Sequence, residues 1–201
     1  LAKRLKRNIR GEVLFDRYSR GRYSTDASIY QIEPVGVVVP RDEEDIKCVI
    51  SIAAEEQVPL LMRGAGTSQC GQTVGLALVI DVSKYMNQIL DLDLEQQQVQ
   101  VQPGIVLDQL NERLRPHNLF FPVDVSTASR ATIGGMSGNN SCGARSIHYG
   151  IMRDNVFAID AYLADGTKIN FGPVQANAAA TGASDRYREL ITELMLLAER
   201  E

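Results

Sequence analysis

The chain has 201 residues and a formal net charge of −4, with 44% hydrophobic and 23% charged residues. This length suits one domain of two lobes with a sizeable core, and the composition argues against a disordered chain. A negative net charge argues against a nucleic-acid partner, whose phosphates need a basic face. The sequence also has no run of about 18 apolar residues, the length that crosses a membrane.

Five basic residues lie near the N-terminus: Lys3, Arg4, Lys6, Arg7 and Arg10. We interpret them as the solvated face of a first helix, and no apolar signal-peptide core accompanies them. The three cysteines, Cys48, Cys70 and Cys142, have no CxxC spacing. They favour a reduced, cytoplasmic protein without disulfides or a metal site, with peripheral membrane attachment of a full-length protein left open.

A βαβ unit is predicted near the start of the chain. Residues 35–39 form a β-branched run that indicates a buried strand. Asp42 is a suitable N-cap for a helix that ends near Glu56. Residues 58–62 give the next strand, which leads into the glycine-rich stretch 63–69.

Regular elements continue along most of the remaining chain. The sequence predicts a strand over 76–82, a hairpin of 89–94 and 98–102, a helix over 105–114, strands over 156–163 and 168–171, a linker over 175–184 and a helix from Ser184 or Asp185. Residues 122–150 show few regular signals, and so long an irregular stretch is often functional. The chain ends inside the last helical pattern, so we expect it to be a piece of a longer protein.

The predicted fold class is α+β, with two α/β lobes. The small lobe is expected over about residues 30–85 and the larger lobe over about 86–174, followed by a linker and the start of a helix over 175–201. Two glycine-rich segments would line the cleft between the lobes.

The first glycine-rich segment is Arg63–Gln69. Gly64 and Gly66 let the backbone approach a ligand, and successive N–H groups can form an anion-binding nest. No Gly-Lys-Ser/Thr follows, so it is not a Walker A loop, and Gln69 stands where the Rossmann fingerprint needs its third glycine. A plain turn without a ligand is the alternative.

The second segment runs from Pro122 to Gly143. Its glycines leave backbone uncovered (Gly134, Gly135, Gly138 and Gly143), and its short polar side chains lie between them (Thr132, Ser137, Asn139 and Asn140). Such a surface suits a flat, polar heterocycle and its phosphates. A structural cluster of loops is the alternative.

Together the two segments resemble the FAD-binding domain of the vanillyl-alcohol oxidase and p-cresol methylhydroxylase (PCMH-type) superfamily. The resemblance covers nearly the whole chain, from Pro34 to Pro173. The matching stretches are Val37–Pro40, Arg63–Ser68, Gly71–Gln72, Gln102–Gly104, Ala131–Gly135, Asn140–Gly143, Tyr149–Gly150 and Leu163–Gly166. Within the superfamily the chain looks most like the D-lactate, glycolate and D-2-hydroxyglutarate dehydrogenase branch. Residues Ser24–Tyr30 and Ser126–Gly135 resemble its large bacterial members.

The resemblance assigns cofactor roles to individual residues. It implies that Gly64, Ala65, Gly66, Thr67 and Ser68 wrap the FAD pyrophosphate, supported by Gly71 and Gln72. It implies that Asp124, Ser126 and Thr127 border the cofactor, and that Ala131, Thr132, Gly134, Gly135 and Ser137 follow the ribityl chain and isoalloxazine. Asn139, Asn140 and Gly143 would close the pocket, and Ile159 would contribute a backbone contact. Thr67 stands where covalent members carry histidine, so the FAD is expected to be non-covalent. Cys142 stands where a small residue is more usual.

The same resemblance implies a flavin-dependent oxidoreductase that takes a hydride from C2 of a 2-hydroxy acid onto flavin N5, giving the 2-oxo acid. Its catalytic base would lie on a downstream cap domain that this chain lacks, so the chain alone is expected to be catalytically incomplete. An iron–sulfur domain or another electron acceptor is a further expected partner. A sugar-alcohol or aldonolactone oxidase, a non-catalytic flavin-binding module and a purely structural domain are the alternatives.

The remaining titratable residues suggest no catalytic triad. His117 follows a predicted helix and is expected to be solvated, whereas His148 lies near the predicted pocket without an evident partner. Cys70 is interpreted as a buried, inert thiol, with a reactive thiol beside an electropositive nest as the alternative. Arg153 and Asp154 are interpreted as a structural pair.

Overall fold

The computed structural model describes residues 1–172 and 185–200, so the predicted linker over 175–184 lies outside the described residues. The chain divides into two compact units, Leu1–Val156 and Phe157–Glu201. The two lobes predicted over about 30–85 and 86–174 remain a prediction.

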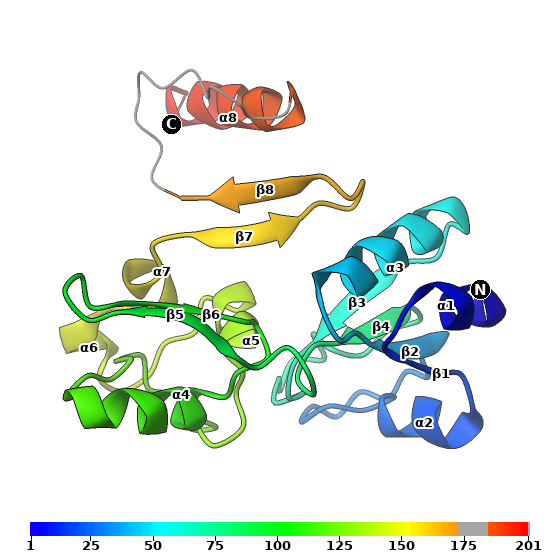
Figure 1. The fold of residues 1–201 in the computed structure, drawn as a ribbon, viewed down its shortest axis with the longest axis horizontal. Coiled ribbons are helices and arrows are strands. Elements are labelled where there is room, and N and C mark those ends of the chain that lie inside the picture. The colour runs from blue at the N-terminus through cyan, green and yellow to red at the C-terminus, as the bar shows by residue number, and fades with distance from the viewer. Residues whose placement is uncertain (173–184, 201) are drawn as a thin grey trace. The chain divides into compact units, whose positions relative to one another are not determined.

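The first unit contains most of the regular elements (Figure 1). Its helices are α1 (Ala2–Asn8), α2 (Arg17–Arg22), α3 (Glu43–Glu55), α4 (Leu107–Leu114), α5 (Ile133–Gly138), α6 (Ser146–Tyr149) and α7 (Met152–Asn155), with a 3-10 turn η1 (Arg115–His117). Its strands are β1 (Glu12–Leu14), β2 (Gly36–Val39), β3 (Leu60–Arg63), β4 (Leu78–Asp81), β5 (Ile89–Asp93) and β6 (Gln98–Val101). Helices and strands are mixed, which confirms the predicted α+β class.

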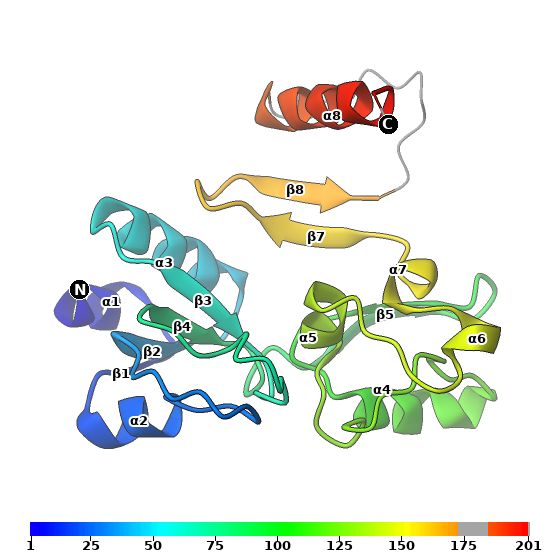
Figure 2. The same cartoon turned by 180° about the vertical axis from the view of Figure 1, so that it is seen from behind.

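The first sheet has the strand order β1-β2-β4-β3. Strands β2 and β3 both run parallel to β4, and β1 pairs antiparallel with β2. Every residue of β2 and β4 is buried, as the β-branched and aliphatic runs predicted. Figures 1 and 2 show α3 and α2 on opposite sides of this sheet. The sequence predicted α3 with its Asp42 N-cap, whose carboxylate accepts the Asp45 N–H at 3.1 Å, but it missed β1 and α2.

A second core lies between the β5–β6 hairpin and α4. Leu107, Leu110 and Leu114 of α4 are buried, and Leu92 and Val99 of the hairpin pack against the same cluster. The hairpin was predicted, and of the residues expected at helical spacing Leu110 and Leu114 are buried, whereas Val106 is the N-cap of α4 and Leu107 takes the core position.

Residues 122–150 are more regular than the sequence indicated. They contain α5 and α6, and α7 follows directly. Helix α5 has the sequence Ile-Gly-Gly-Met-Ser-Gly, whose three glycines make it a poor helix former on propensity alone. Ile133 and Met136 are buried in the second core, so tertiary packing stabilises a helix that the local sequence disfavours.

The second unit contains the predicted pair of strands β7 (Ile159–Tyr162) and β8 (Lys168–Phe171), which pair antiparallel, and helix α8 (Asp185–Ala198). Gly166 in the connecting turn has φ 83°, a conformation that glycine adopts without strain. Of the helices in the described ranges 1–172 and 185–200, none is both long and apolar enough to cross a membrane.

Asp45 joins the N-terminal segment to the first sheet. Its side chain is 3% exposed, and its two oxygens accept the N–H groups of Arg10 at 2.8 Å and Arg41 at 2.9 Å. A buried carboxylate that satisfies two backbone donors stabilises the fold more than an exposed acid in the first turn of a helix.

We therefore expect Asp45→Ala to lower the free energy of unfolding by ~2–3 kcal/mol, because two N–H groups lose a charged acceptor. Asp108→Ala, in the first turn of α4, is the matched control and is expected to cost less than ~1 kcal/mol. Urea unfolding followed by circular dichroism measures both. Equal losses of unfolding free energy in the two variants would show that Asp45 contributes only through the helix dipole.

Candidate functional site

The first candidate segment is the loop of residues 64–73, which leaves the carboxyl end of β3. Gly66 has φ 68° and Gly71 has φ 73°, so both positions use a conformation that other residues rarely adopt. The backbone N–H groups of residues 65–69 have no hydrogen-bond acceptor among the described residues. Such successive free donors on a loop are available to an anionic ligand.

Side chains within this loop fix its far end. The Ser68 hydroxyl donates to Gln72 Oε1 at 2.7 Å and accepts the Cys70 N–H at 3.2 Å. Because these bonds use the Ser68 and Gln72 side chains, both residues contribute to the shape of the loop.

The second candidate segment is built around Thr132 and α5. Thr132 is the N-cap of α5, and its hydroxyl oxygen accepts the Gly135 N–H at 3.3 Å. Gly134 donates its N–H to the Pro103 carbonyl at 2.8 Å, and a Cβ atom at position 134 would lie 2.6 Å from Pro103 Cβ. The start of α5 is thus held against the segment that precedes α4.

The two glycine segments lie against each other. A Cβ atom at position 64 would lie 2.1 Å from Thr132 Oγ1, so only glycine allows this approach. A second contact joins the same loops, since Gln72 Nε2 donates to Asn139 Oδ1 at 3.0 Å. The structure therefore brings together two segments that the sequence analysis paired from their composition and order.

The border of the second segment is formed by Asp124 and Gly143. A Cβ atom at position 143 would lie 1.5 Å from the Asp124 carbonyl oxygen, so glycine is required there by protein packing. The Asp124 carboxylate accepts the Arg145 N–H at 3.0 Å and lies 4.0 Å from the Arg145 Nε. Asn140, with φ 46°, accepts the Arg153 N–H at 3.1 Å.

The predicted cofactor residues differ in exposure. Ala65, Gln72, Ser126, Gly135, Asn139 and Asn140 are exposed, and Gly64, Gly66, Thr67, Ser68, Gly71, Asp124, Thr127, Gly134, Ser137 and Gly143 are partly exposed. Ala131 and Thr132 are only 6% and 2% exposed, so their side chains serve packing. Ile159 is exposed and begins β7 in the second unit, and its predicted role remains a prediction.

The other titratable residues noted in the sequence lie at the surface. His117 is exposed in η1, as expected, and the exposed His148 ring lies 4.5 Å from that of Tyr149. Arg153 and Asp154 form the expected pair at 3.6 Å. Cys70 is exposed, which corrects the expected buried thiol, because its loop runs over the surface. Among the described residues, no cluster of three or more His, Cys, Asp or Glu could hold a metal ion.

Sequence reasoning missed three residues that hold the first loop. Arg63 Nη1 donates to the Thr73 carbonyl at 3.2 Å, and the Thr73 hydroxyl donates to Asp26 Oδ2 at 3.1 Å. Arg63 was noted only as the residue before the glycines. Asp26 and Thr73 are 47 positions apart, and no local pattern links them.

The fold and the paired glycine-rich loops, with their free backbone N–H groups, are features of a cofactor-binding domain. A family model described as "FAD binding domain" matches residues 34–172. The chain belongs to this family of PCMH-type FAD-binding domains, as the resemblance implied.

Curated relatives carry related names. The chain is 39% identical over 188 residues to a D-2-hydroxyglutarate dehydrogenase of Pseudomonas putida, covering 89% of this chain and 19% of the relative. It is 38% identical over 171 residues to the glycolate oxidase subunit GlcD of Bacillus subtilis, covering 82% of this chain and 36% of the relative. The chain thus spans well under half the length of these relatives.

A solved structure has the same fold. The 6-hydroxy-D-nicotine oxidase of Arthrobacter nicotinovorans matches with a TM-score of 0.74 and 18% identity, covering 86% of this chain and 37% of that one. At this identity the match supports the fold and nothing finer.

We predict that Gly64→Ala destabilises the contact between the two glycine segments, because the added Cβ would meet Thr132 Oγ1 at 2.1 Å. The expected loss in the free energy of unfolding is ~1–3 kcal/mol. Gly138→Ala is the matched control, since nothing lies within 4 Å of its added Cβ, and the substitution in α5 is expected to be neutral or stabilising. Thermal unfolding compares the two, and an unaffected Gly64→Ala protein would contradict the close approach.

Proposed function

We propose that this chain binds FAD non-covalently between its two glycine segments and serves as the cofactor domain of a 2-hydroxy acid dehydrogenase. The observation that carries the proposal is the direct contact of the segments, Gly64 against Thr132 and Gln72 against Asn139. This contact sets the free N–H groups of one segment beside the polar surface of the other. Membership of the FAD-binding domain family supports the choice of cofactor.

In this proposal the backbone does most of the binding. The N–H groups of residues 65–69 hold the FAD pyrophosphate, because they lack acceptors within the described chain and can form an anion nest. The exposed Gly135, which has no side chain, lets the rest of the cofactor approach the backbone of α5, and Asn139, whose Oδ1 accepts from Gln72, borders the same surface. Bound FAD supplies the hydride acceptor of the reaction, and the chain orients it and shields one side from water.

The proposed substrate class is a 2-hydroxy acid of the D-2-hydroxyglutarate, glycolate or D-lactate type, as the names of the relatives suggest. The groups that remove the hydroxyl proton and bind the substrate carboxylate are assigned to a cap domain outside residues 1–201. This division agrees with the described part of the site, residues 64–73 and 122–143, which contains loop backbone and no histidine. A partner that accepts electrons, such as an iron–sulfur domain, completes the proposed enzyme.

The non-covalent mode of binding is testable by acid precipitation of the FAD-loaded chain. Thr67 has no imidazole to form a bond with the flavin, so we expect all yellow flavin in the supernatant and the mass of the precipitated chain unchanged. Flavin that stays with the precipitate would contradict non-covalent binding. A wild-type chain that takes up no FAD would contradict the proposed function itself.

We also expect the FAD-loaded chain to be catalytically incomplete, because hydride transfer needs a base and a positioned substrate. The chain is mixed anaerobically with D-lactate, glycolate and D-2-hydroxyglutarate, and bleaching of the flavin absorbance is followed. Dithionite serves as the control that the flavin can be reduced. Rapid bleaching by any of the three acids would place the catalytic groups within residues 1–201.

A further inference from the structure

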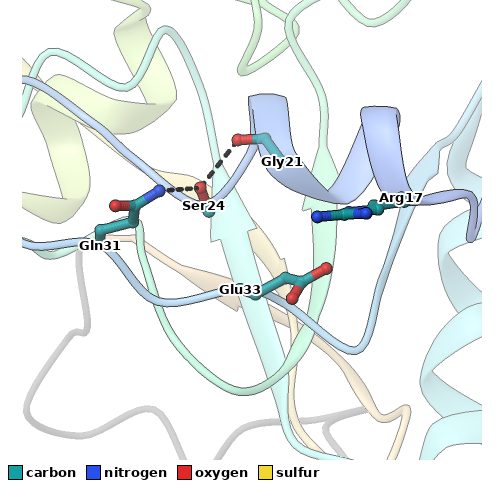
Figure 3. A pocket seen from close by; sticks show the side chains of 5 residues that line it. All are labelled: Arg17, Gly21, Ser24, Gln31 and Glu33. Atoms are coloured by element: carbon teal, nitrogen blue, oxygen red, sulfur yellow. Dashed lines mark hydrogen bonds between the residues drawn. The ribbon is translucent and has the colours of Figure 1, made fainter.

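Residues 24–32, named here the N-terminal loop, form a closed loop before the first long strand. Thr25 and Gln31 pair in an antiparallel bridge, and Ile32 donates its N–H to the Ser24 carbonyl at 2.9 Å. Ser24 is 2% exposed, and its hydroxyl donates to the Gly21 carbonyl at 2.8 Å (Figure 3). The base of the N-terminal loop is thus fixed to the end of α2.

The tip of the N-terminal loop lies on the glycine loop 64–73. Ala27 donates its N–H to the Gly66 carbonyl at 3.1 Å. Asp26 Oδ2 accepts the Thr73 hydroxyl at 3.1 Å and the Thr73 N–H at 3.4 Å. The Tyr30 ring lies against Gly71, where an added Cβ atom would lie 2.6 Å from the ring. Both glycines of positive φ in the glycine loop therefore contact the N-terminal loop.

Arg63, the last residue of β3, forms hydrogen bonds to both the N-terminal loop and the glycine loop. Its Nη1 donates to the Thr73 carbonyl at 3.2 Å and its Nη2 to the Thr25 carbonyl at 2.8 Å. The guanidinium lies 5.3 Å from the centre of the Tyr23 ring, an attractive arrangement for a cation. The Tyr23 hydroxyl donates to the buried Asp81 at 2.6 Å, so this ring is itself fixed. Burial and the Asp81 carboxylate raise the pKa of Tyr23, which keeps this donor protonated.

The Asp26 side chain accepts hydrogen bonds with both of its carboxylate oxygens. Its Oδ1 accepts the Ser28 N–H at 2.8 Å, and its Oδ2 accepts the Thr73 hydroxyl. Burial raises the pKa of Asp26, but the hydrogen bonds from Ser28 and Thr73 outweigh that effect and lower the pKa below its ordinary value. The carboxylate is therefore charged at neutral pH, when its hydrogen bonds are strongest.

We propose that the N-terminal loop preorganises the glycine loop 64–73 for the cofactor, with Asp26 and Arg63 as positioning residues that contact the glycine loop and not the FAD. The residues matched by the family model begin at 34, so the N-terminal loop lies outside the matched domain. A loop held in one conformation before binding does not pay the entropy of ordering when the ligand arrives. The role in FAD binding rests on the function proposed above.

The test measures the order of the glycine loop without cofactor, by ¹⁵N relaxation of the amides of residues 65–69. In the wild-type chain we expect order parameters near 0.85, the value of a rigid backbone, and in Asp26→Ala and Thr73→Val values below about 0.6. Thr73→Ser keeps the hydroxyl that donates to Asp26 and is expected to restore the wild-type values. Asp93→Ala is the matched control, because Asp93 Oδ1 also accepts two N–H groups, at 2.9 Å each, in the β5–β6 turn.

Wild-type order parameters in both Asp26→Ala and Thr73→Val would overturn the proposal, and Thr73→Val covers the case in which Asp26→Ala fails to fold. A flavin titration follows, in which Thr73→Val is expected to raise the FAD dissociation constant roughly tenfold and Thr73→Ser to leave it unchanged. Loss of loop order with unchanged FAD affinity would also overturn the preorganising role. A wild-type chain that binds no FAD would contradict the proposed function, while the relaxation data would still decide whether the N-terminal loop orders the glycine loop.

Discussion

The close approach of Gly64 to Thr132 is the constraint on which the candidate site depends. The loop after β3 and the start of α5 come from different parts of the chain, and they meet only because position 64 has no side chain. Thr132 also caps α5 and forms a bridge with Val106, so one residue links the first loop, the helix and the segment before α4. A change at this contact would alter the position of each of these parts.

Glycine is required at different positions of the two segments for different physical reasons. At Gly64, Gly134 and Gly143 an added Cβ atom would clash with other parts of the protein, so these glycines let backbone segments pack closely. Gly138 faces open space, and Gly66 and Gly71 provide positive φ. A glycine-rich sequence can therefore indicate close packing of backbone segments as well as a ligand-binding loop. The free N–H groups of residues 65–69 are the more direct evidence for an anionic ligand.

The order of the glycine loop depends on polar groups outside it. Arg63 and Asp26 supply a cation and an anion that bond to backbone and hydroxyl groups of Thr73, and the Tyr23 ring supports the cation. Such support matters for this surface loop, because residues 64–73 contain few apolar side chains that could hold it in place. Rigid support of this kind is a general requirement for sites built on loops.

The sequence by itself determined the elements that have a strong local pattern, which are α3 with its Asp42 cap, the two hairpins and the buried strands β2 and β4. It also identified the two glycine segments, because their composition is unusual. Only the tertiary structure decided that β4 lies between β2 and β3, that the glycine-rich α5 is helical, and that residues 24–32 contact the loop 64–73. Helix caps and hydrophobic periodicity involve residues that are close in the sequence, so they can be recognised locally. The other features depend on contacts between distant residues, and these contacts stabilise the protein only after the chain has folded.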